Sequence, residues 1–103
     1  MTEALISDDD AAELATILKA LSDPVRLKLV SYIACNTEAC SCDFDQIIDK
    51  SQPTISHHLT QLVKADILER EQRGKWAWFK INPDRLKALR TALGCDPVPG
   101  PTK

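Results

Sequence analysis

The chain has 103 residues and a mass of 11.4 kDa, enough for one small domain whose modest core a second subunit would help to cover. Hydrophobic residues make up 44% of it and charged residues 27%, a balance typical of a folded protein rather than a disordered one. The net charge of −2 conceals a segregation, because residues 1–49 hold three Lys or Arg against ten Asp or Glu, whereas residues 50–90 hold nine against four.

Three segments are predicted along the chain. An acidic tail covers residues 1–9, one folded domain covers residues 10–93, and a Pro-rich tail covers residues 94–103. No apolar stretch approaches the roughly 20 residues of a membrane span, and the N-terminus is acidic where a signal peptide is basic, so we expect a cytoplasmic protein with no membrane partner. The three glycines cannot supply a Gly-rich phosphate loop and no motif places a general base, so an enzyme is not expected.

The first two helices are predicted from apolar periodicity and from the break between them. Apolar residues recur at i, i+3, i+4 and i+7 in the first helix: Leu14, Ile17, Leu18 and Leu21. Asp23 and Pro24 then begin the second helix, because an Asp side chain caps free amide groups and proline suits the first helical turn. Val25, Leu29 and Ile33 form the apolar stripe of this helix, which is predicted to end near residue 35.

The middle of the chain is predicted to hold two short helices separated by a tight break. Residues 37–42 have no clear period. The third helix, over residues 43–49, is expected to bury three apolar side chains: Phe44, Ile47 and Ile48. Ser51 then caps a fourth helix that has Pro53 in its first turn.

A change of period after residue 66 predicts a two-stranded hairpin. Residues 67–72 and 76–81 form its strands around a turn at Gly74. The last helix, over residues 84–93, has three leucines on one face: Leu86, Leu89 and Leu93. The predicted fold is therefore mainly α with a small β-hairpin, in the order α-α-α-α-β-β-α, which is a winged helix-turn-helix.

The basic part of the chain, residues 50–90, is where contact with double-stranded DNA is expected. A helix that enters the major groove needs short polar side chains near its N-terminus. The predicted contacts in the first turns of the fourth helix are Ser51, Gln52, Thr54, Ser56 and His57. Arg73 and Lys75 at the hairpin tip are placed to reach a DNA backbone or minor groove, whereas His58 is expected to pack or to form a hydrogen bond within the protein. A solvated, well-capped helix start is the alternative interpretation of the polar residues.

Three sequence blocks occur in a fixed order: Leu-Ser-Asp-Pro-Val-Arg-Leu at 21–27, Ser-Gln-Pro-Thr-Ile-Ser-His-His-Leu at 51–59 and Glu-Arg-Glu-Gln-Arg-Gly-Lys-Trp at 69–76. Together they resemble the ArsR/SmtB family of metal-sensing repressors. The resemblance covers residues 10–93 and implies a winged-helix homodimer, paired through its first and last helices, that binds operator DNA until an effector binds. One departure is Asp49-Lys50, where members often have a glycine, although Asp tolerates unusual backbone angles.

The four cysteines are expected to be reduced in the cytoplasm, as ligands or redox thiols rather than a disulfide framework. Cys40 and Cys42 would point apart on a regular helix, so closing both on one ion requires an extended or distorted backbone. Residues 38–44 resemble the Cys-x-Cys box with which arsenic-responsive members bind trivalent arsenic, an ion that prefers thiolates. The resemblance implies Cys40 and Cys42 as ligands, and Cys35 is the preferred third thiolate with Cys95 as the alternative.

The predicted effector is trivalent arsenic, with antimony possible, and its binding would strain the start of the following helix and so lower DNA affinity. In some members a third cysteine stands where this chain has Asp45, a poor ligand for arsenic. A cadmium or lead sensor is one alternative, and a redox or persulfide sensor that joins Cys95 to an upstream cysteine is another. The cysteines can also be small buried residues with no ligand role. Residues 82–93 contain no histidine, so a zinc, nickel or cobalt site on the last helix is not expected.

Overall fold

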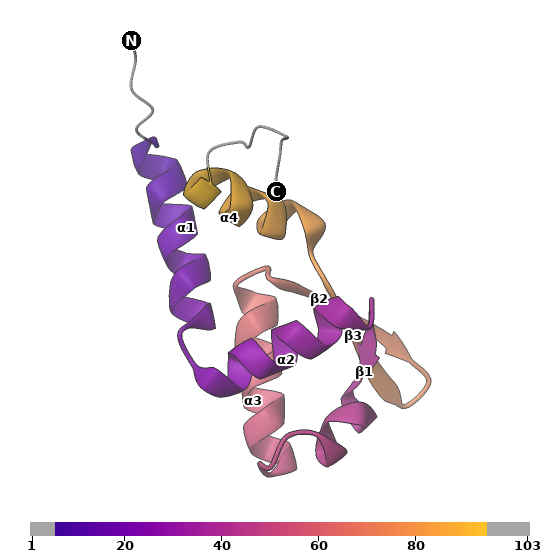
Figure 1. Ribbon diagram of the computed structural model, residues 1–103. Coiled ribbons are helices and arrows are strands. Elements are labelled where there is room, and N and C mark those ends of the chain that lie inside the picture. Colours follow the sequence, from indigo (N-terminus) through magenta and orange to yellow (C-terminus); the bar gives the residue numbers. More distant parts are fainter. Residues whose placement is uncertain (1–5, 95–103) are drawn as a thin grey trace, which may run out of the picture.

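A computed structural model describes residues 6–94 of the chain (Figure 1). Within these residues the elements, in chain order, are α1 (Asp8–Leu21), α2 (Pro24–Cys35), β1 (Ala39–Cys40), the 3₁₀ helix η1 (Ser41–Gln46), α3 (Gln52–Lys64), β2 (Leu68–Arg73), β3 (Trp76–Ile81) and α4 (Pro83–Gly94). The fold is mainly helical with a small antiparallel sheet, as predicted.

The caps of the first two helices follow from their sequences. Asp23 caps α2, because its Oδ1 accepts a hydrogen bond from the backbone N–H of Val25 at 2.8 Å, as predicted. Helix α1 begins at Asp8, inside the segment expected to be a tail. Ser7 caps it by accepting a hydrogen bond from the Asp10 N–H at 3.1 Å. The acidic side chains of the first turn interact favourably with the positive end of the helix dipole.

The segment between α2 and α3 differs from the prediction. Ala39 and Cys40 form the short strand β1, where no period was expected. The predicted helix over residues 43–49 is replaced by η1, which ends at Gln46. The Cys40 N–H donates to the Asp43 carboxylate at 3.0 Å, and this local cap favours the tighter i→i+3 winding that short connectors use.

The shorter helix changes which side chains reach the core. Phe44 and Ile48 are buried as predicted, but Ile47 follows the end of η1 and remains 44% exposed. The break before α3 also uses no residue with positive φ, since the non-glycine residues of this kind in the described chain are Thr37 and Asp66. Asp49 therefore does not need the unusual backbone angles that its replacement of a glycine suggested.

The sheet has the strand order β1-β3-β2, with all neighbours antiparallel. A two-residue turn joins β2 to β3, and Gly74 in it has a φ of +61°, which a glycine adopts without strain. The register places Cys40 directly opposite Trp78 and Glu69 opposite Lys80. Strand β1 thereby ties the cysteine segment to the hairpin.

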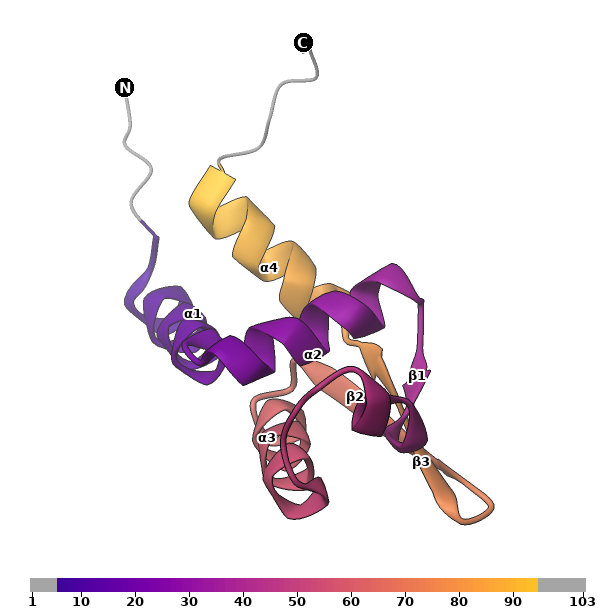
Figure 2. The same cartoon turned by 60° about the horizontal axis from the view of Figure 1, so that its bottom comes forward.

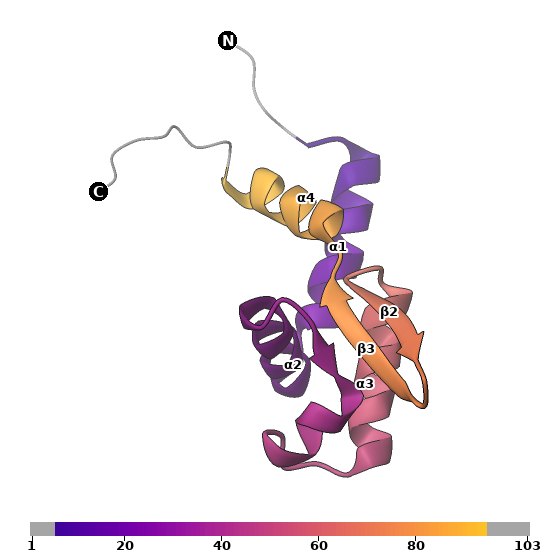
Figure 3. The same cartoon turned by 90° about the vertical axis from the view of Figure 1, so that its right-hand side faces the viewer.

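One core joins all the layers. Its buried side chains come from every helix except α4 and from all three strands, and the larger of them are Ile17, Leu29, Ile33, Phe44, Ile48, Ile55, Leu59, Leu62, Ile67, Leu68 and Phe79. Helices α1 and α4 lie at one end of the molecule, and α3 with the hairpin tip reaches the other (Figures 1 and 3). The result is the predicted winged helix-turn-helix.

Candidate functional site

Helix α3 presents a polar face at its N-terminal end. Ile55 and Leu59 are buried on the opposite face, whereas Gln52, Ser56 and His57 are exposed. This division leaves three of the predicted DNA contacts on the solvent side of the helix, as a groove-reading helix requires.

Two other predicted contacts serve the helix start itself. Ser51 is the N-cap of α3, with its Oγ accepting from the Thr54 N–H at 3.3 Å and donating to Thr54 Oγ1 at 2.9 Å. Thr54 is half-buried. Both hydroxyls are therefore already engaged, so their first role is to fix the end of the helix.

Helix α3 and the hairpin tip lie at the same end of the molecule (Figure 2), and residues of both line a groove of about 560 Å³. Gln52 and Ser56 line it from the helix, and Lys75 and Trp76 line it from the hairpin. Ser41, which separates the two cysteines of the Cys-x-Cys segment, also borders it. The groove thus brings the helix start, the hairpin tip and the cysteine segment together.

Arg73 does not face this groove as a free cation. Its guanidinium donates to both carboxylate oxygens of Glu38, at 2.8 and 3.0 Å, and to Glu71 at 2.9 and 3.2 Å. It also lies over the ring of Trp78, with Cζ 4.7 Å from the ring centroid. The hydrogen bond from Arg73 holds the pKa of the Glu38 carboxyl below its ordinary value, and the bonds to Glu38 and Glu71 raise the pKa of Arg73. Of the two predicted contacts at the tip, only Lys75 lines the groove.

His58 has the internal role expected of it. Its Nδ1 accepts a hydrogen bond from Arg26 Nε at 3.0 Å, and Arg26 Nη1 donates to the carbonyl of Ala20 at 3.3 Å. This pair connects α2 to α3 and steadies the helix that carries the polar face. Sequence reasoning did not find Arg26, because its partner is 32 residues away on another helix.

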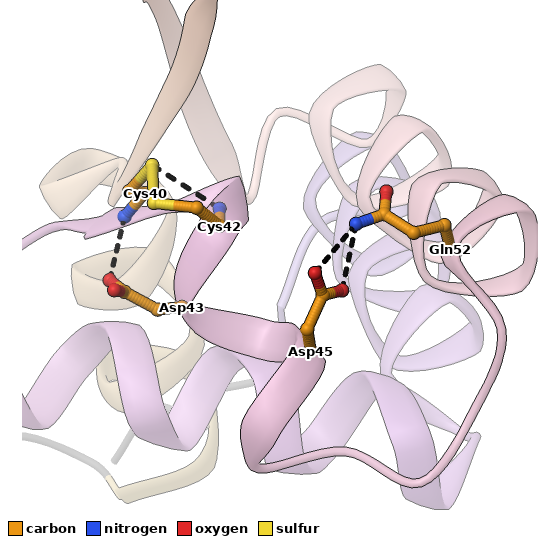
Figure 4. Close-up of a disulfide and its surroundings, with 5 residues drawn as sticks. All are labelled: Cys40, Cys42, Asp43, Asp45 and Gln52. Atoms are coloured by element: carbon orange, nitrogen blue, oxygen red, sulfur yellow. Dashed lines mark hydrogen bonds between the residues drawn. A yellow bond between two sulfur atoms is a disulfide. The ribbon is translucent and has the colours of Figure 1, made fainter.

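The Cys-x-Cys segment brings two sulfurs together (Figure 4). Cys40 has the extended backbone that convergence requires, with φ −83° and ψ 145°, and its Cα lies 5.1 Å from that of Cys42. The structure joins the two as a disulfide, whereas the sequence analysis expected reduced thiols. The cause is local, because β1 and the start of η1 turn both side chains to the same side.

The predicted third thiolate is not brought to this pair. Cys35 is an exposed free thiol at the end of α2. Across residues 6–94, no group of three or more His, Cys, Asp or Glu side chains is arranged to hold a metal ion. Cys95 lies outside the described residues. The pair itself offers two soft sulfur donors, which suits a thiophilic ion.

The sequence did not reveal the contacts of two carboxylates beside the cysteine pair. Asp45 accepts hydrogen bonds from Gln52 Nε2 at 2.7 Å (Oδ1) and 3.0 Å (Oδ2), as Figure 4 shows, and Glu38 binds Arg73. Hydrophobic periodicity does not reveal these contacts, because Gln52 lies beyond the break before α3 and Arg73 reaches Glu38 only through strand pairing. The sequence does show that one carboxylate stands on each side of the cysteine pair.

A family model described as bacterial regulatory protein, arsR family, matches residues 23–70, from the cap of α2 into β2. An uncharacterized HTH-type transcriptional regulator of Methanocaldococcus jannaschii is 41% identical over 73% of this chain and 84% of its own length. An arsenical resistance operon repressor of Staphylococcus xylosus is 39% identical over 79% of this chain and 77% of its own length. A homolog of the cadmium resistance transcriptional regulatory protein CadC, from Staphylococcus aureus, is 31% identical over 82% and 69%.

Solved structures share the fold at lower identity. An ArsR-like transcriptional regulator from Rhodococcus sp. RHA1 superposes with a TM-score of 0.72 at 21% identity, over 82% of this chain and 79% of that one. The antimony-specific transcriptional repressor AntR gives a TM-score of 0.72 at 24% identity, over 90% and 85%. Within the described part of the chain, no helix has both the length and the apolar character that crossing a membrane requires.

Proposed function

Because the chain belongs to the arsR family of bacterial regulatory proteins, we propose that it releases operator DNA when trivalent arsenic, or antimony, binds the thiols of Cys40 and Cys42. Members of the family are DNA-binding transcriptional regulators and not enzymes, and this chain is a transcriptional repressor of that kind. The effector and the residues that bind it are the proposed part.

The observation that carries the proposal is the convergence of the Cys40 and Cys42 side chains directly before the DNA-reading unit. Thiolates are the preferred ligands of trivalent arsenic and antimony, so two converging sulfurs suit either ion. Cys35 is the proposed third ligand, with Cys95 as the alternative, and Cys35 requires a rearrangement or the second subunit to reach the pair. The arsenical resistance relative and the antimony repressor support this class of effector.

DNA contact is proposed for the polar face of α3 and the hairpin tip. Replacing Gln52 or Ser56 with alanine should weaken operator binding more than non-specific binding. Both side chains are exposed and line the groove between α3 and the hairpin, where they can reach base edges in the major groove of DNA. Replacing Arg73 should weaken both and reduce the salt dependence of binding. Unchanged operator affinity in the Gln52 and Ser56 variants would remove this assignment.

A homodimer is proposed through α1 and α4. Leu18 on α1 and Leu86 on α4 are each 42% exposed, although their neighbours Ile17 and Leu89 pack toward the core. A chain of this size cannot cover both leucines by itself, and a second copy can.

Redox sensing is the second candidate function, because the structure joins Cys40 to Cys42. A peroxide would oxidise the two thiols to the disulfide and be reduced to water, taking up two electrons and two protons. Cadmium or lead sensing remains a further alternative, supported by the CadC homolog. Both alternatives use the same two sulfurs and differ in the agent that closes them.

The deciding experiment measures whether each candidate effector releases DNA from the reduced protein. The DNA is a fluorescent duplex that has been selected from a random pool for binding to the protein. Arsenite, antimonite, cadmium, lead and peroxide are titrated separately and followed by anisotropy. We expect arsenite or antimonite to release the DNA at the lowest concentration, and Cys40→Ser or Cys42→Ser to abolish release without loss of DNA binding. Release by peroxide alone would favour the redox function.

The third ligand is tested in the same assay. Cys35→Ser should lose the response to arsenite and Cys95→Ser should respond nearly as the parent does. The reverse outcome would move the third thiolate to the C-terminal end, and a normal response in both variants would mean that two thiols suffice.

A further inference from the structure

Each flank of the cysteine pair carries a carboxylate that holds one predicted DNA contact. Glu38 stands two residues before Cys40 and binds Arg73, and Asp45 stands three residues after Cys42 and binds Gln52. The cysteines therefore sit in the middle of one short segment, residues 38–45, whose two ends reach the two parts of the DNA-reading surface.

The contact of Glu38 occupies the edge of Arg73 that DNA would use. The two oxygens of Glu38 accept from Nη1 and Nη2 in the forked geometry that a phosphate also adopts. Nε and Nη2 donate in addition to Glu71, so that all three guanidinium nitrogens are engaged. A phosphate must displace a carboxylate to bind Arg73 through two N–H groups in this arrangement, because only one N–H of Nη1 is left.

The contact of Asp45 restricts Gln52 in a similar way. A glutamine reads adenine by donating from its amide nitrogen and accepting at its amide oxygen. Here both oxygens of Asp45 lie within 3.0 Å of Gln52 Nε2. The donor half of the reading pair is thus held by the protein, next to a negative charge that also repels phosphate from the start of α3.

The two contacts are connected mechanically to the sulfurs. Cys40 lies opposite Trp78 in the sheet, and the ring of Trp78 supports the guanidinium of Arg73 at 4.7 Å. The N–H of Cys40 donates to Asp43, and the N–H of Cys42 donates to Cys40 Sγ at 3.2 Å. These contacts give a path by which joining or separating the sulfurs would move the residues that flank Glu38 and Asp45.

We propose that Glu38 and Asp45 are positioning residues that withhold Arg73 and Gln52 from DNA while the sulfurs of Cys40 and Cys42 are closed together, and that opening the pair releases both. The inference rests on the proposed DNA contacts, but it does not depend on which agent closes the pair. It adds a direct competition between carboxylates and DNA to the strain at the helix start.

The test compares the closed and open forms of the intact protein on a random-sequence duplex. Diamide closes the pair by taking up its two electrons and two protons, and a dithiol reductant opens it, with mass spectrometry to verify each form. In the closed form, Glu38→Gln should raise affinity several-fold and steepen the salt slope by about 0.9, the share of one phosphate contact. In the open form, the same substitution should raise affinity only by the smaller amount that the loss of any one negative charge produces, and it should leave the salt slope unchanged.

Glu69→Gln is the matched control for charge. Glu69 is an exposed carboxylate on β2 that borders the same pocket as Glu38, but it lies opposite Lys80 and accepts no hydrogen bond from Arg73. It should produce a smaller rise in affinity that is equal in the two forms. An equal effect of Glu38→Gln and Glu69→Gln would overturn the proposal, as would a loss of affinity in Glu38→Gln, which would mean that Glu38 prepares Arg73 for DNA.

The role of Asp45 is read from sequence discrimination. In the closed form, Asp45→Asn should increase the ratio of affinity for the selected operator to affinity for the random duplex, whereas the control Asp49→Asn should leave this ratio unchanged. An unchanged ratio in Asp45→Asn would mean that Asp45 does not withhold Gln52 from DNA. Failure of arsenite to release DNA from the parent would reject the proposed effector and leave these comparisons intact, so the two failures are distinguishable.

Discussion

The two ends of the molecule differ in the balance of their contacts. At the end formed by α1 and α4, apolar side chains including Leu21 and Leu89 surround a hollow of about 60 Å³, and Arg85 at its border adds ion pairs to Glu13 and Asp66. At the end formed by α3, the hairpin and residues 38–45, the tertiary contacts outside the core are charged hydrogen bonds such as Glu38 with Arg73. The first end suits permanent burial, and the second suits exchange with a charged ligand.

The difference has a physical basis. Apolar burial is non-directional and is lost only when the surface returns to water. An exposed ion pair contributes little to stability, because water and counter-ions replace each partner easily. A regulator that must keep its subunits together while it binds and leaves DNA can therefore place most of its exposed apolar side chains at one end and rely on charged hydrogen bonds at the other.

The largest expected effect tests how the cysteine segment is anchored to the core. Phe44 on η1 is fully buried and meets the ring of Tyr32 edge-to-face at 5.7 Å. Phe44→Ala should lower the free energy of unfolding by about 3–5 kcal/mol, measured by urea denaturation. The control Ile47→Ala removes an exposed side chain and should change it by less than about 0.5 kcal/mol. Equal losses would mean that Ile47 belongs to the core after all.

The next effect tests the apolar end. Leu86→Glu places a charge on the face proposed for dimerisation, twice in each dimer, and should weaken association by about 100-fold or more. Light scattering across a dilution series measures the change. Leu27→Glu is the control, because Leu27 is 51% exposed on α2 and outside the proposed interface. Loss of the dimer in both variants would place the interface elsewhere.

A smaller effect is expected at the hinge between α2 and the cysteine segment. Thr37 has a φ of 71°, an unfavourable angle for a β-branched residue. Thr37→Asn should raise the free energy of unfolding by about 1 kcal/mol, because asparagine tolerates this conformation. The control Thr60→Asn, on an exposed position of α3, should leave it nearly unchanged. Destabilisation by Thr37→Asn would show that the threonine makes a contact worth more than the strain.

The helices α1 to α4 were predictable because their signals are local, whereas the helix expected over residues 43–49 was wrong. Asp23 before Pro24 and Ser51 before Pro53 mark helix starts within a few residues, and the structure confirms both caps. The hairpin was equally predictable from Gly74 and the alternation beside it. Each of these signals needs only neighbours in the sequence.

The parts that sequence reasoning missed depend on partners far along the chain. Strand β1 exists because Ala39 and Cys40 pair with β3 about 40 residues later, and no local period announces a two-residue strand. The engagement of Arg73 by Glu38 follows from that same pairing. The sequence therefore indicated which residues carry charge or sulfur, but it did not indicate which of them are already occupied.

The smallest expected effect is a change in the pKa of Glu38, which tests the ion pair with Arg73 at the charged end of the molecule. The hydrogen bond from Arg73 lowers the pKa of Glu38 from its ordinary value of 4.5, so Arg73→Ala should return it toward that value. A carboxyl group whose pKa is lowered by folding stabilises the folded state at any pH above its ordinary pKa. This contribution is lost as the pH falls through the lowered pKa. The stability difference between the parent and Arg73→Ala should therefore shrink as the pH falls below 4.5.

Carbon-detected NMR titration of the Glu38 carboxyl measures this shift in the folded protein. Lys75→Ala is the control, because it removes one positive charge from the hairpin turn but not the group that bonds to Glu38. The pKa of Glu38 should move clearly in Arg73→Ala and only slightly in Lys75→Ala. Equal pKa shifts in the two variants would show that Glu38 responds to the overall positive charge of the hairpin. In that case Glu38 would have no specific bond to Arg73 and could not keep this one arginine from DNA.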